Sequence, residues 1–262
     1  MTPIFSSDFV RCIFTDTDNN NKESKVGKVD VFIAETGDIV SMYMELVKYI
    51  SGEEKLRAEK LYSEQMKETY VICHSLLRLI LAKMLGQVPQ DVKYITGESN
   101  KPALEGNPVY FNITHTANAF AICVSEDFYL GADMEEMNRK IDIHPIIEYY
   151  FSSKEREFIL TPGTEQEIRR RFFLLWTRKE ALLKAFGTGI IENISQIEVC
   201  SRENVISRKL FDDKMPDCEV KPLWLYSGLT GNSYLTVAVP GEASFSFYRL
   251  NAGNIVSYLN NN

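Results

Sequence analysis

The sequence lacks the segments that direct a chain into or across a membrane. It contains no run of about 18 apolar residues, the length that a membrane-spanning helix needs. Its first residues, Met1 to Phe9, show no basic stretch followed by an apolar core, so no secretory signal is visible. We therefore expect a cytoplasmic protein with no membrane partner.

Cysteine is scarce and scattered. The five cysteines are odd in number and form no C-x-x-C pair; they are Cys12, Cys73, Cys123, Cys200 and Cys218. This pattern is typical of a reducing compartment and argues against both a disulfide framework and a zinc site.

The sequence also lacks an excess of positive charge and the usual nucleotide motifs. Its formal net charge of −7 argues against general nucleic-acid binding. No glycine-rich phosphate loop of the Walker or dinucleotide type and no G-x-S-x-G motif occurs. A bound nucleotide would therefore be held mainly by basic side chains, a hydroxyl–histidine element and a metal ion.

Helical and extended segments alternate along the 262 residues, of which 45% are hydrophobic, enough to bury a large core. Two apolar-faced helices are predicted, from Tyr70 to a glycine stop at Gly86 and from Glu167 to Phe186 before Gly187. Antiparallel strands are expected to follow each helix, and this repeated rhythm suggests an internal duplication. The predicted strands are Val26–Ala34, Val109–Ile113, Ala119–Val124, Tyr129–Met134, Ile194–Cys200, Leu223–Ser227, Leu235–Val239 and Ala243–Tyr248.

The first chemical candidate is Gly131-Ala-Asp133-Met-Glu135. In a strand, residues two apart point to the same face, so Asp133 and Glu135 would lie side by side. Each carboxylate makes ionisation of the other costlier, and a divalent cation such as Mg²⁺ would relieve that cost. A solvated strand end with two unrelated acids is the alternative.

The second candidate is Phe172-Phe-Leu-Leu-Trp-Thr-Arg-Lys-Glu-Ala-Leu-Leu-Lys184. Glu180 and Lys184 are four residues apart, so they share one helix face with Trp176. An exposed salt bridge of little energetic value is the alternative.

The third candidate is Phe111-Asn-Ile-Thr-His-Thr116, preceded by a loop that contains Lys101-Pro102. A hydroxyl beside an imidazole at the end of a strand can bind phosphate together with backbone donors. A turn histidine without a role is the alternative.

Taken in order, these motifs resemble those of the Sfp-type 4′-phosphopantetheinyl transferases of the holo-acyl-carrier-protein synthase superfamily. The resemblance covers roughly residues 45 to 190 and includes Phe151-Ser-Ser-Lys-Glu155, which lies between the Gly131–Glu135 and Trp176–Lys184 motifs. Threonines replace both serines of the family's S-H-S element, and His74 stands where relatives often carry other residues.

The resemblance implies a pseudo-twofold α/β (α+β) fold with halves at residues 1–130 and 131–262. Each half would pack a small antiparallel sheet on a long helix, with the active site between the halves. It also implies transfer of the 4′-phosphopantetheine arm of coenzyme A to a serine of an apo acyl or peptidyl carrier protein, with release of 3′,5′-ADP. A single chain that holds both halves is expected to act as a monomer.

The resemblance further assigns roles to individual residues. Mg²⁺, or alternatively Mn²⁺, would be held by Asp133, Glu135 and Glu180, and Glu180 would also act as the base. Lys184 would stabilise the diphosphate. The remaining contacts to coenzyme A would come from Arg57, Lys101, Pro102, Thr114, His115 and Lys179.

Two other functions are the alternatives. A metal-dependent phosphohydrolase or nuclease would need the carboxylates, although a nuclease also predicts a broad basic track. A catalytically silent protein that binds coenzyme A or a carrier would not need the metal set. Carrier docking is expected between Asn138 and Ile159, with the basic stretch Arg169–Lys184 attracting an acidic partner.

Overall fold

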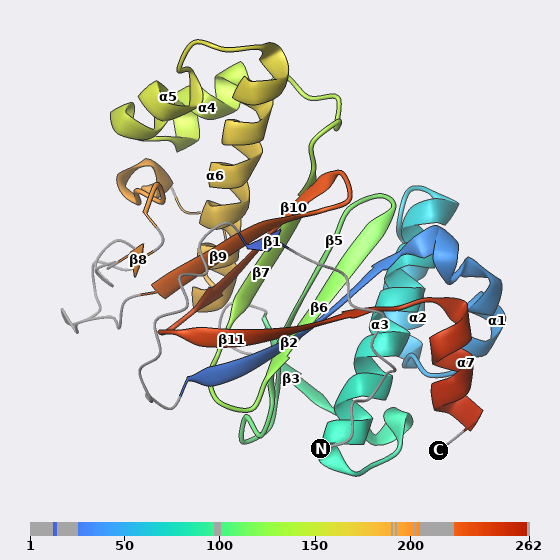
Figure 1. The fold of residues 1–262 in the computed structure, drawn as a ribbon. Helices are drawn as coiled ribbons and strands as arrows, with labels where there is room; N and C mark the ends of the chain where they lie inside the picture. The colour runs from blue at the N-terminus through green and yellow to red at the C-terminus, as the bar shows by residue number, and fades with distance from the viewer. Residues whose placement is uncertain are drawn as a thin grey trace.

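Two β-sheets pack face to face at the centre of the molecule, and a long helix covers the outer face of each (Figure 1). The structure is a computed structural model that describes residues 13–14, 26–96, 101–189, 191, 193–201, 203–204 and 223–260. Cys12 and Cys218 lie outside the described residues. The mixed α/β class expected from the sequence is confirmed.

The first sheet has the strand order β11-β2-β6-β5 and the second the order β1-β9-β10-β7, with β8 also paired to β9. A short ribbon of β3 and β4 stands apart from both. The strands are β1 (Ile13–Phe14), β2 (Gly27–Glu35), β3 (Tyr94–Thr96), β4 (Pro102–Leu104), β5 (Tyr110–His115), β6 (Ala119–Ser125), β7 (Gly131–Glu136), β8 (Glu203–Asn204), β9 (Leu223–Thr230), β10 (Ser233–Val239) and β11 (Ala243–Arg249).

Each long helix ends where the sequence predicts, at a glycine with left-handed backbone geometry. Helix α3 (Glu64–Leu85) ends at Gly86 with φ +65°, and helix α6 (Glu165–Phe186) ends at Gly187 with φ +73°. The shorter helices are α1 (Tyr43–Leu46), α2 (Gly52–Glu59), α4 (His144–Tyr150), α5 (Ser153–Ile159) and α7 (Ala252–Asn260). No described helix is both long and apolar enough to cross a bilayer.

Alternation along the strands determines which residues face the helices and which face the other sheet. In β2, Phe32 packs with the α3 side chains, whereas Val31 packs against the second sheet. In β7, Ala132 and Met134 face the layer between the sheets, so Asp133 and Glu135 face the opposite way, toward α6. The fold thereby places both acids on the α6 side of β7.

The connectivity repeats. Strand β2 precedes α3 and pairs with β6, which pairs with β5; strand β7 precedes α6 and pairs with β10, which pairs with β9. The division at residue 130 stays a prediction. The ends of the chain pair across it, because the C-terminal β11 joins β2 and the N-terminal β1 joins β9.

The strand pairing corrects one expectation. The β11–β2 pair is parallel, so the sheet that contains β2 is not wholly antiparallel. A hairpin would force neighbouring strands to run antiparallel. No hairpin joins β11 to β2, because most of the chain lies between them, so a parallel pair can form.

The predicted strand Ile194–Cys200 is wrong. Its first residues form a 3₁₀ turn (Ile194–Gln196), and the rest pairs with no described strand. Ile197 and Val199 are both buried, and this accounts for the alternation of apolar and polar residues that suggested a strand. Their backbone groups bond to side chains instead, because Lys179 Nζ donates to Ile197 O and Val199 N donates to Glu155 Oε1.

Gly131 allows β7 to lie directly on the backbone of α6. A Cβ at this position would stand 2.0 Å from Ala181 O and 2.2 Å from Ala185 N. No side chain can move to relieve that contact, because both atoms belong to the helix backbone. The glycine that opens the G-x-D-x-E motif therefore fixes the spacing between Asp133 and α6.

We predict that Gly131→Ala lowers the free energy of unfolding by about 1–3 kcal/mol through overpacking. Chemical denaturation would measure the loss. Gly52→Ala is the matched control, because a Cβ on Gly52 meets nothing within 4 Å. Equal stability of the two variants would contradict a close contact at Gly131.

Candidate active site

Asp133 lies at the centre of the polar cluster between β7 and α6. The residue is 5% exposed, and its Oδ1 accepts a hydrogen bond from Lys184 Nζ at 2.7 Å. Its other oxygen, Oδ2, is buried and has no hydrogen-bond partner among the described residues. A buried carboxylate with one unsatisfied oxygen is a strong acceptor for a cation.

Glu180 and Glu135 surround Asp133 with further negative charge. Burial, and then the charges of Asp133 and Glu135, raise the pKa of Glu180 to about 7, although Lys184 opposes the change. Burial and Asp133 also raise the pKa of Glu135, against the charge of Arg139. Arg139 Nη1 lies 3.1 Å from Glu135 Oε2. The three acids that the sequence analysis singled out therefore lie near enough to influence one another's ionisation.

Thr114 joins the two sheets at this cluster. It lies on β5, and its hydroxyl oxygen accepts a hydrogen bond from Met134 N of β7 at 2.9 Å and a longer one from Lys184 Nζ at 3.4 Å. Asn112, on the same strand, accepts from Ala132 N at 2.8 Å. Side chains of β5 thus bond the backbone of β7, and the hydroxyl predicted to meet phosphate lies beside Asp133.

His115 ends β5 and lies at the exposed rim of the cluster. Partial desolvation and the positive charges of Lys184 and His74 lower the pKa of its imidazole, while Asp133 opposes them. His115 is therefore near both Lys184 and His74, on the side of the cluster that belongs to the first sheet.

Lys101 bridges the same region through backbone atoms. Its Nζ donates to Leu130 O at 2.8 Å and to Lys184 O at 2.7 Å. Burial and the charge of Lys184 lower its pKa to about 8. Lys101 and the adjacent Pro102 also line a cavity of about 360 Å³ with Tyr110 and Phe186. The predicted Lys-Pro element therefore lies next to Lys184.

The predicted metal ligands agree with a hard cation in chemistry, but no site is formed. Within the described ranges, no three His, Cys, Asp or Glu side chains are arranged as a metal-binding group. Lys184 is bound to Asp133, and Arg139 to Glu135, where a cation would otherwise neutralise these acids. Oxygen donors and the unsatisfied Asp133 Oδ2 fit Mg²⁺ or Mn²⁺, so the residues suit the ion.

Arg57 lies in the last turn of α2 and is exposed. Its charge opposes the rise that burial and Glu54 produce in the pKa of Tyr70, so it lies near the Tyr70 ring on α3. Tyr70 in turn stacks on His74, with ring centroids 3.9 Å apart. Arg57 thus lies near Tyr70, which stacks on His74, and the charge of His74 in turn acts on His115.

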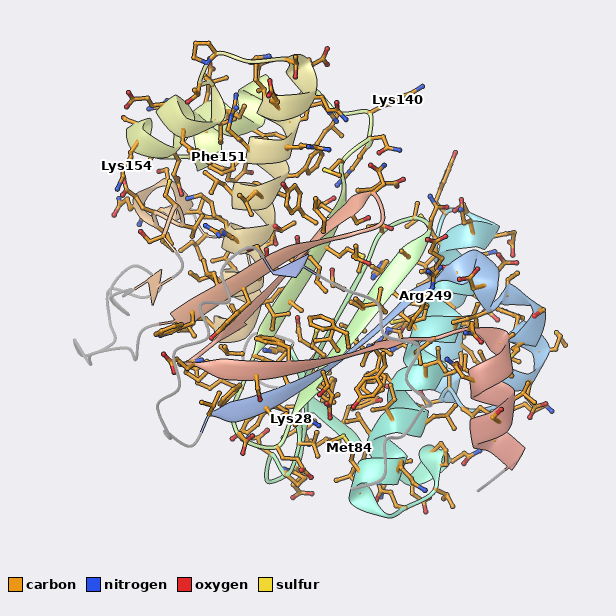
Figure 2. The ribbon with its side chains drawn as sticks, in the orientation of Figure 1. Lys28, Met84, Lys140, Phe151, Lys154 and Arg249 are labelled. Carbon is orange, nitrogen blue, oxygen red and sulfur yellow. The ribbon has the colours of Figure 1, made fainter. Side chains whose placement is uncertain are left out.

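Lys179 does not join the cluster, and this corrects its predicted contact with coenzyme A. The side chain is fully buried and forms an ion pair with Glu155 at 2.9 Å. Its Nζ also donates to Ile194 O at 3.0 Å and lies 5.2 Å from the centre of the Phe151 ring. Figure 2 shows Phe151 between the short helices and α6. Lys179 and Glu180 are neighbours in the sequence. Consecutive residues of a helix point in different directions, so Lys179 lies on another face of α6 than Glu180.

This ion pair explains a motif to which the sequence analysis gave no role. Glu155 belongs to Phe151-Ser-Ser-Lys-Glu155, and its backbone and side chain form a capping box with Ser152 at the start of α5. An S-x-x-E pattern is itself a signal for such a cap. The burial of Glu155 against Lys179 has no comparable signal, because their sequence separation is large.

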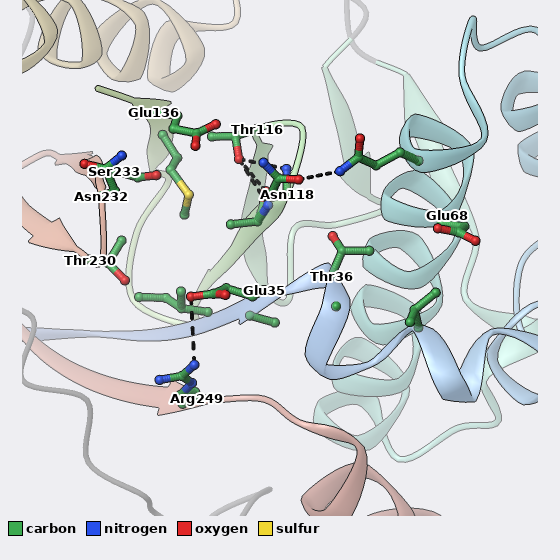
Figure 3. A pocket seen from close by; sticks show the side chains of 18 of the residues that line it. Glu35, Thr36, Glu68, Thr116, Asn118, Glu136, Thr230, Asn232, Ser233 and Arg249 are labelled. Atoms are coloured by element: carbon green, nitrogen blue, oxygen red, sulfur yellow. Dashed lines mark hydrogen bonds and ion pairs between the residues drawn. The ribbon is translucent and has the colours of Figure 1, made fainter. Parts of the chain in front are cut away.

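A second, larger cavity lies on the other face of β7. Its volume is about 600 Å³, and Figure 3 shows side chains of both sheets around it, including Thr116, Glu136 and Ser233. Arg249 lies 3.9 Å from Glu35 at its edge. The alternation that turns Asp133 and Glu135 toward α6 turns Met134 and Glu136 toward this cavity. It is therefore separated from the acidic cluster by the strand itself.

Comparison with known proteins gives a family match over the second half of the chain. Residues 129–235 match the family model described as the 4′-phosphopantetheinyl transferase superfamily. The matched segment contains β7, α6 and all three acids of the cluster.

Similar proteins carry the corresponding name. A Synechocystis sp. relative, provisionally named as a 4′-phosphopantetheinyl transferase, is 30% identical over 56% of this chain and 61% of its own length. The 4′-phosphopantetheinyl transferase HetI of a Nostoc sp. is 29% identical over 61% of this chain and 68% of its own length. The transferase Sfp of Bacillus subtilis is 24% identical over 67% and 77%, respectively. The chain thus spans about three fifths to three quarters of these relatives.

The raised pKa of Glu180 predicts a pH-dependent gain in stability for Glu180→Gln. A folded-state pKa of about 7 lies above the ordinary value of 4.5, so this group's contribution to the free energy of unfolding falls as pH rises from 4.5 through 7. Glutamine stays neutral. The variant should therefore match the native protein near pH 4.5 and exceed it by about 2–3 kcal/mol at pH 8.

Denaturation at both pH values would measure this difference. Glu157→Gln, at an exposed position on α5, serves as the control and should show no such trend. A pH-independent effect of Glu180→Gln would show that Glu180 is not held among like charges.

Lys179→Met is predicted to lower the free energy of unfolding by about 3–5 kcal/mol, because it leaves Glu155 buried without its counter-ion. Lys154→Met is the matched control, since Lys154 pairs with Glu198 at the surface and the loss should be below about 1 kcal/mol. Thermal or urea denaturation would compare them. A Lys179→Met protein as stable as the control would contradict the buried ion pair.

Proposed function

Because residues 129–235 match the family model of the 4′-phosphopantetheinyl transferase superfamily, we propose that the whole chain is a 4′-phosphopantetheinyl transferase. Its substrates would be coenzyme A and the apo form of an acyl or peptidyl carrier protein. Its products would be the holo carrier and 3′,5′-ADP. The family domain covers the second half only, so the pairing of both halves around one site is part of the proposal.

One observation carries this proposal: the charges of Asp133 and Glu135 on β7 act on Glu180 of α6, and Asp133 pairs with Lys184 of the same helix at 2.7 Å. Such a cluster of acids is unfavourable by itself, and an ion or a transferable proton gives it a use. The Lys184 ammonium and the His115 imidazole, which lie near each other, can donate hydrogen bonds to a ligand with several negative charges.

In the proposed reaction, the carrier serine oxygen forms a bond to the phosphorus that bears the pantetheine arm. The bond from that phosphorus to the bridging oxygen breaks, and 3′,5′-ADP leaves with the electron pair. The serine proton passes to the carboxylate of Glu180, directly or through a water. A pKa of about 7 suits a general base at neutral pH.

The remaining residues would bind and orient the substrate. Lys184 would neutralise the diphosphate once it leaves Asp133, and Thr114 would offer its hydroxyl at the seam of the sheets. His115, Lys101 and Arg57 would hold the nucleotide phosphates. Orientation of the serine against the diphosphate would supply much of the rate.

Asp133, Glu135 and Glu180 are the residues that would hold Mg²⁺ or Mn²⁺. The bound ion would supply neutralisation of the diphosphate charge in the transition state. Lys184 and Arg139 would then be released from the acids to which they are bound here.

The carrier would dock near the cleft, on the segment from Asn138 to Ile159. This segment contains α4 and α5 and exposes Tyr149 and Phe158. Arg170 on α6 is exposed and could attract an acidic carrier, whereas Arg169 donates to the carbonyls of Met137 and Ile141.

The proposal is tested by incubating the protein with coenzyme A, Mg²⁺ and a panel of apo-carrier proteins, followed by mass spectrometry. At least one carrier should gain the mass of a phosphopantetheine group. Asp133→Asn and Lys184→Ala should each lower the rate about a hundredfold or more, because both remove charge from the reacting centre. Chelation of divalent ions should abolish the gain, and added Mg²⁺ should restore it.

Glu242→Gln, at an exposed position between β10 and β11, is the matched control and should keep the native rate. Folded protein that modifies no carrier, yet releases phosphate from coenzyme A, would favour the phosphohydrolase alternative. Binding of coenzyme A without any reaction would favour the silent binding protein.

A further inference from the structure

Two strand edges meet where the two sheets come together. Strand β5 is the last strand of the first sheet, and β7 is the last strand of the second. The two strands lie side by side (Figure 1), yet no backbone pairing joins them in the part of the chain that the structure describes. The backbone groups on this edge of β7 therefore need partners other than a neighbouring strand.

Side chains from the first half of the chain bond this edge at every second residue. The N–H and C=O of one residue point to the same edge of a strand, and those of the next residue point to the opposite edge. The three bonds run from Lys101 Nζ to Leu130 O at 2.8 Å, from Ala132 N to Asn112 Oδ1 at 2.8 Å and from Met134 N to Thr114 Oγ1 at 2.9 Å. We call these three bonds the seam.

The seam holds Asp133 from both sides. The bonded residues Ala132 and Met134 are its direct neighbours, and both are buried. The backbone of Asp133 belongs to the other edge of β7, where it is paired with Thr236 of β10. Its side chain lies 2.7 Å from Lys184 on α6. The position of Asp133 relative to β5 therefore depends on the two seam bonds that flank it.

Asn112 is the seam residue to which no part in the proposed reaction has been given. Lys101 and Thr114 are both proposed to meet the substrate. Asn112 lies two residues before Thr114 on β5, so both side chains are on the same side of the strand. Its amide oxygen is an acceptor, which is what the buried N–H of Ala132 requires.

The seam also joins two sets of groups that must act on one substrate. The residues proposed to bind the nucleotide include Thr114 and His115 on β5, whereas the reacting acids lie on β7 and α6. A displacement of about 1 Å between binding and reacting groups can lower a rate by about a hundredfold. Bonds that fix β7 against β5 can therefore act on the rate without touching the substrate.

We propose that Asn112 is a positioning residue for the transfer reaction: it accepts from Ala132 N, holds β7 against β5, and so keeps Asp133 aligned with the substrate bound at Thr114 and His115. This role rests on the proposed transferase function. The other interpretation is that the bond from Ala132 N only stabilises the fold.

Steady-state kinetics of Asn112→Leu separate these interpretations. Leucine has nearly the same size as asparagine but offers no acceptor to Ala132 N. With a carrier that the native protein modifies, kcat should fall about tenfold or more, and the KM for coenzyme A should change by less than about twofold. Calorimetric binding of coenzyme A should also change by less than about twofold, because the binding groups on β5 remain.

Asn254→Leu is the matched control. Asn254 of α7 also accepts from a backbone group, Asn251 N at 3.0 Å, but it lies away from β7 (Figure 1). Its variant should keep the native kcat even where its Tm falls. Should Asn112→Leu fail to fold, Asn112→Ala replaces it, with Asn254→Ala as its control, because the smaller side chain leaves room for a water at Ala132 N.

A native kcat in the Asn112 variant, or a loss of kcat no larger than that of the Asn254 variant, would overturn the positioning role. A higher KM with an unchanged kcat would overturn it too, since Asn112 would then act in binding alone. If the native protein modifies no carrier, the proposed function fails, and the role of Asn112 fails with it. An active native protein beside an equally active Asn112 variant overturns only the role of Asn112.

Discussion

The close approach of β7 to α6 at Gly131 is the constraint on which the rest of the site depends. With no Cβ at Gly131, the strand lies against the helix backbone, and Asp133 reaches Lys184 at 2.7 Å. The same strand is bonded on its other side by Thr114. A shift of β7 by even one side-chain radius would separate the acids from the lysine and break the seam between the sheets.

The charges at this seam are balanced in pairs that a ligand can replace. Lys184 neutralises Asp133, and Arg139 neutralises Glu135, whereas burial among like charges leaves Glu180 with a pKa of about 7. Each pair costs desolvation that its own attraction repays only in part. The site is therefore prepared for a molecule that brings both negative phosphate to the lysine and a cation to the acids, which agrees with the proposed substrate.

The sequence predicts those parts of the fold and site that follow from local periodicity. Both long helices, their glycine ends and the shared face of Asp133 and Glu135 depend on spacing within single elements. What depends on contacts between distant elements is not predictable in this way. Lys179 looks equivalent to Lys184 in sequence, yet its partner Glu155 lies on α5; the apparent strand at Ile194–Cys200 bonds to side chains of α5 and α6. The parallel β11–β2 pair likewise joins segments more than 200 residues apart.

The two halves use the same local motif in different environments. Each half opens a short helix with a Ser-x-x-Glu capping box, Ser51–Glu54 on α2 and Ser152–Glu155 on α5, and each glutamate reaches a cation on the following long helix. In the second half, the lysine partner is fully buried and its donors meet only protein atoms. In the first, Glu54 binds Arg78 within the core and also His74, whose side chain is 17% exposed. Each oxygen of Glu54 accepts from one of these side chains, whereas Glu155 uses one oxygen for Lys179 and the other for Val199 N. The shared capping box therefore supports a fully buried ion pair in one half and a partly exposed network in the other.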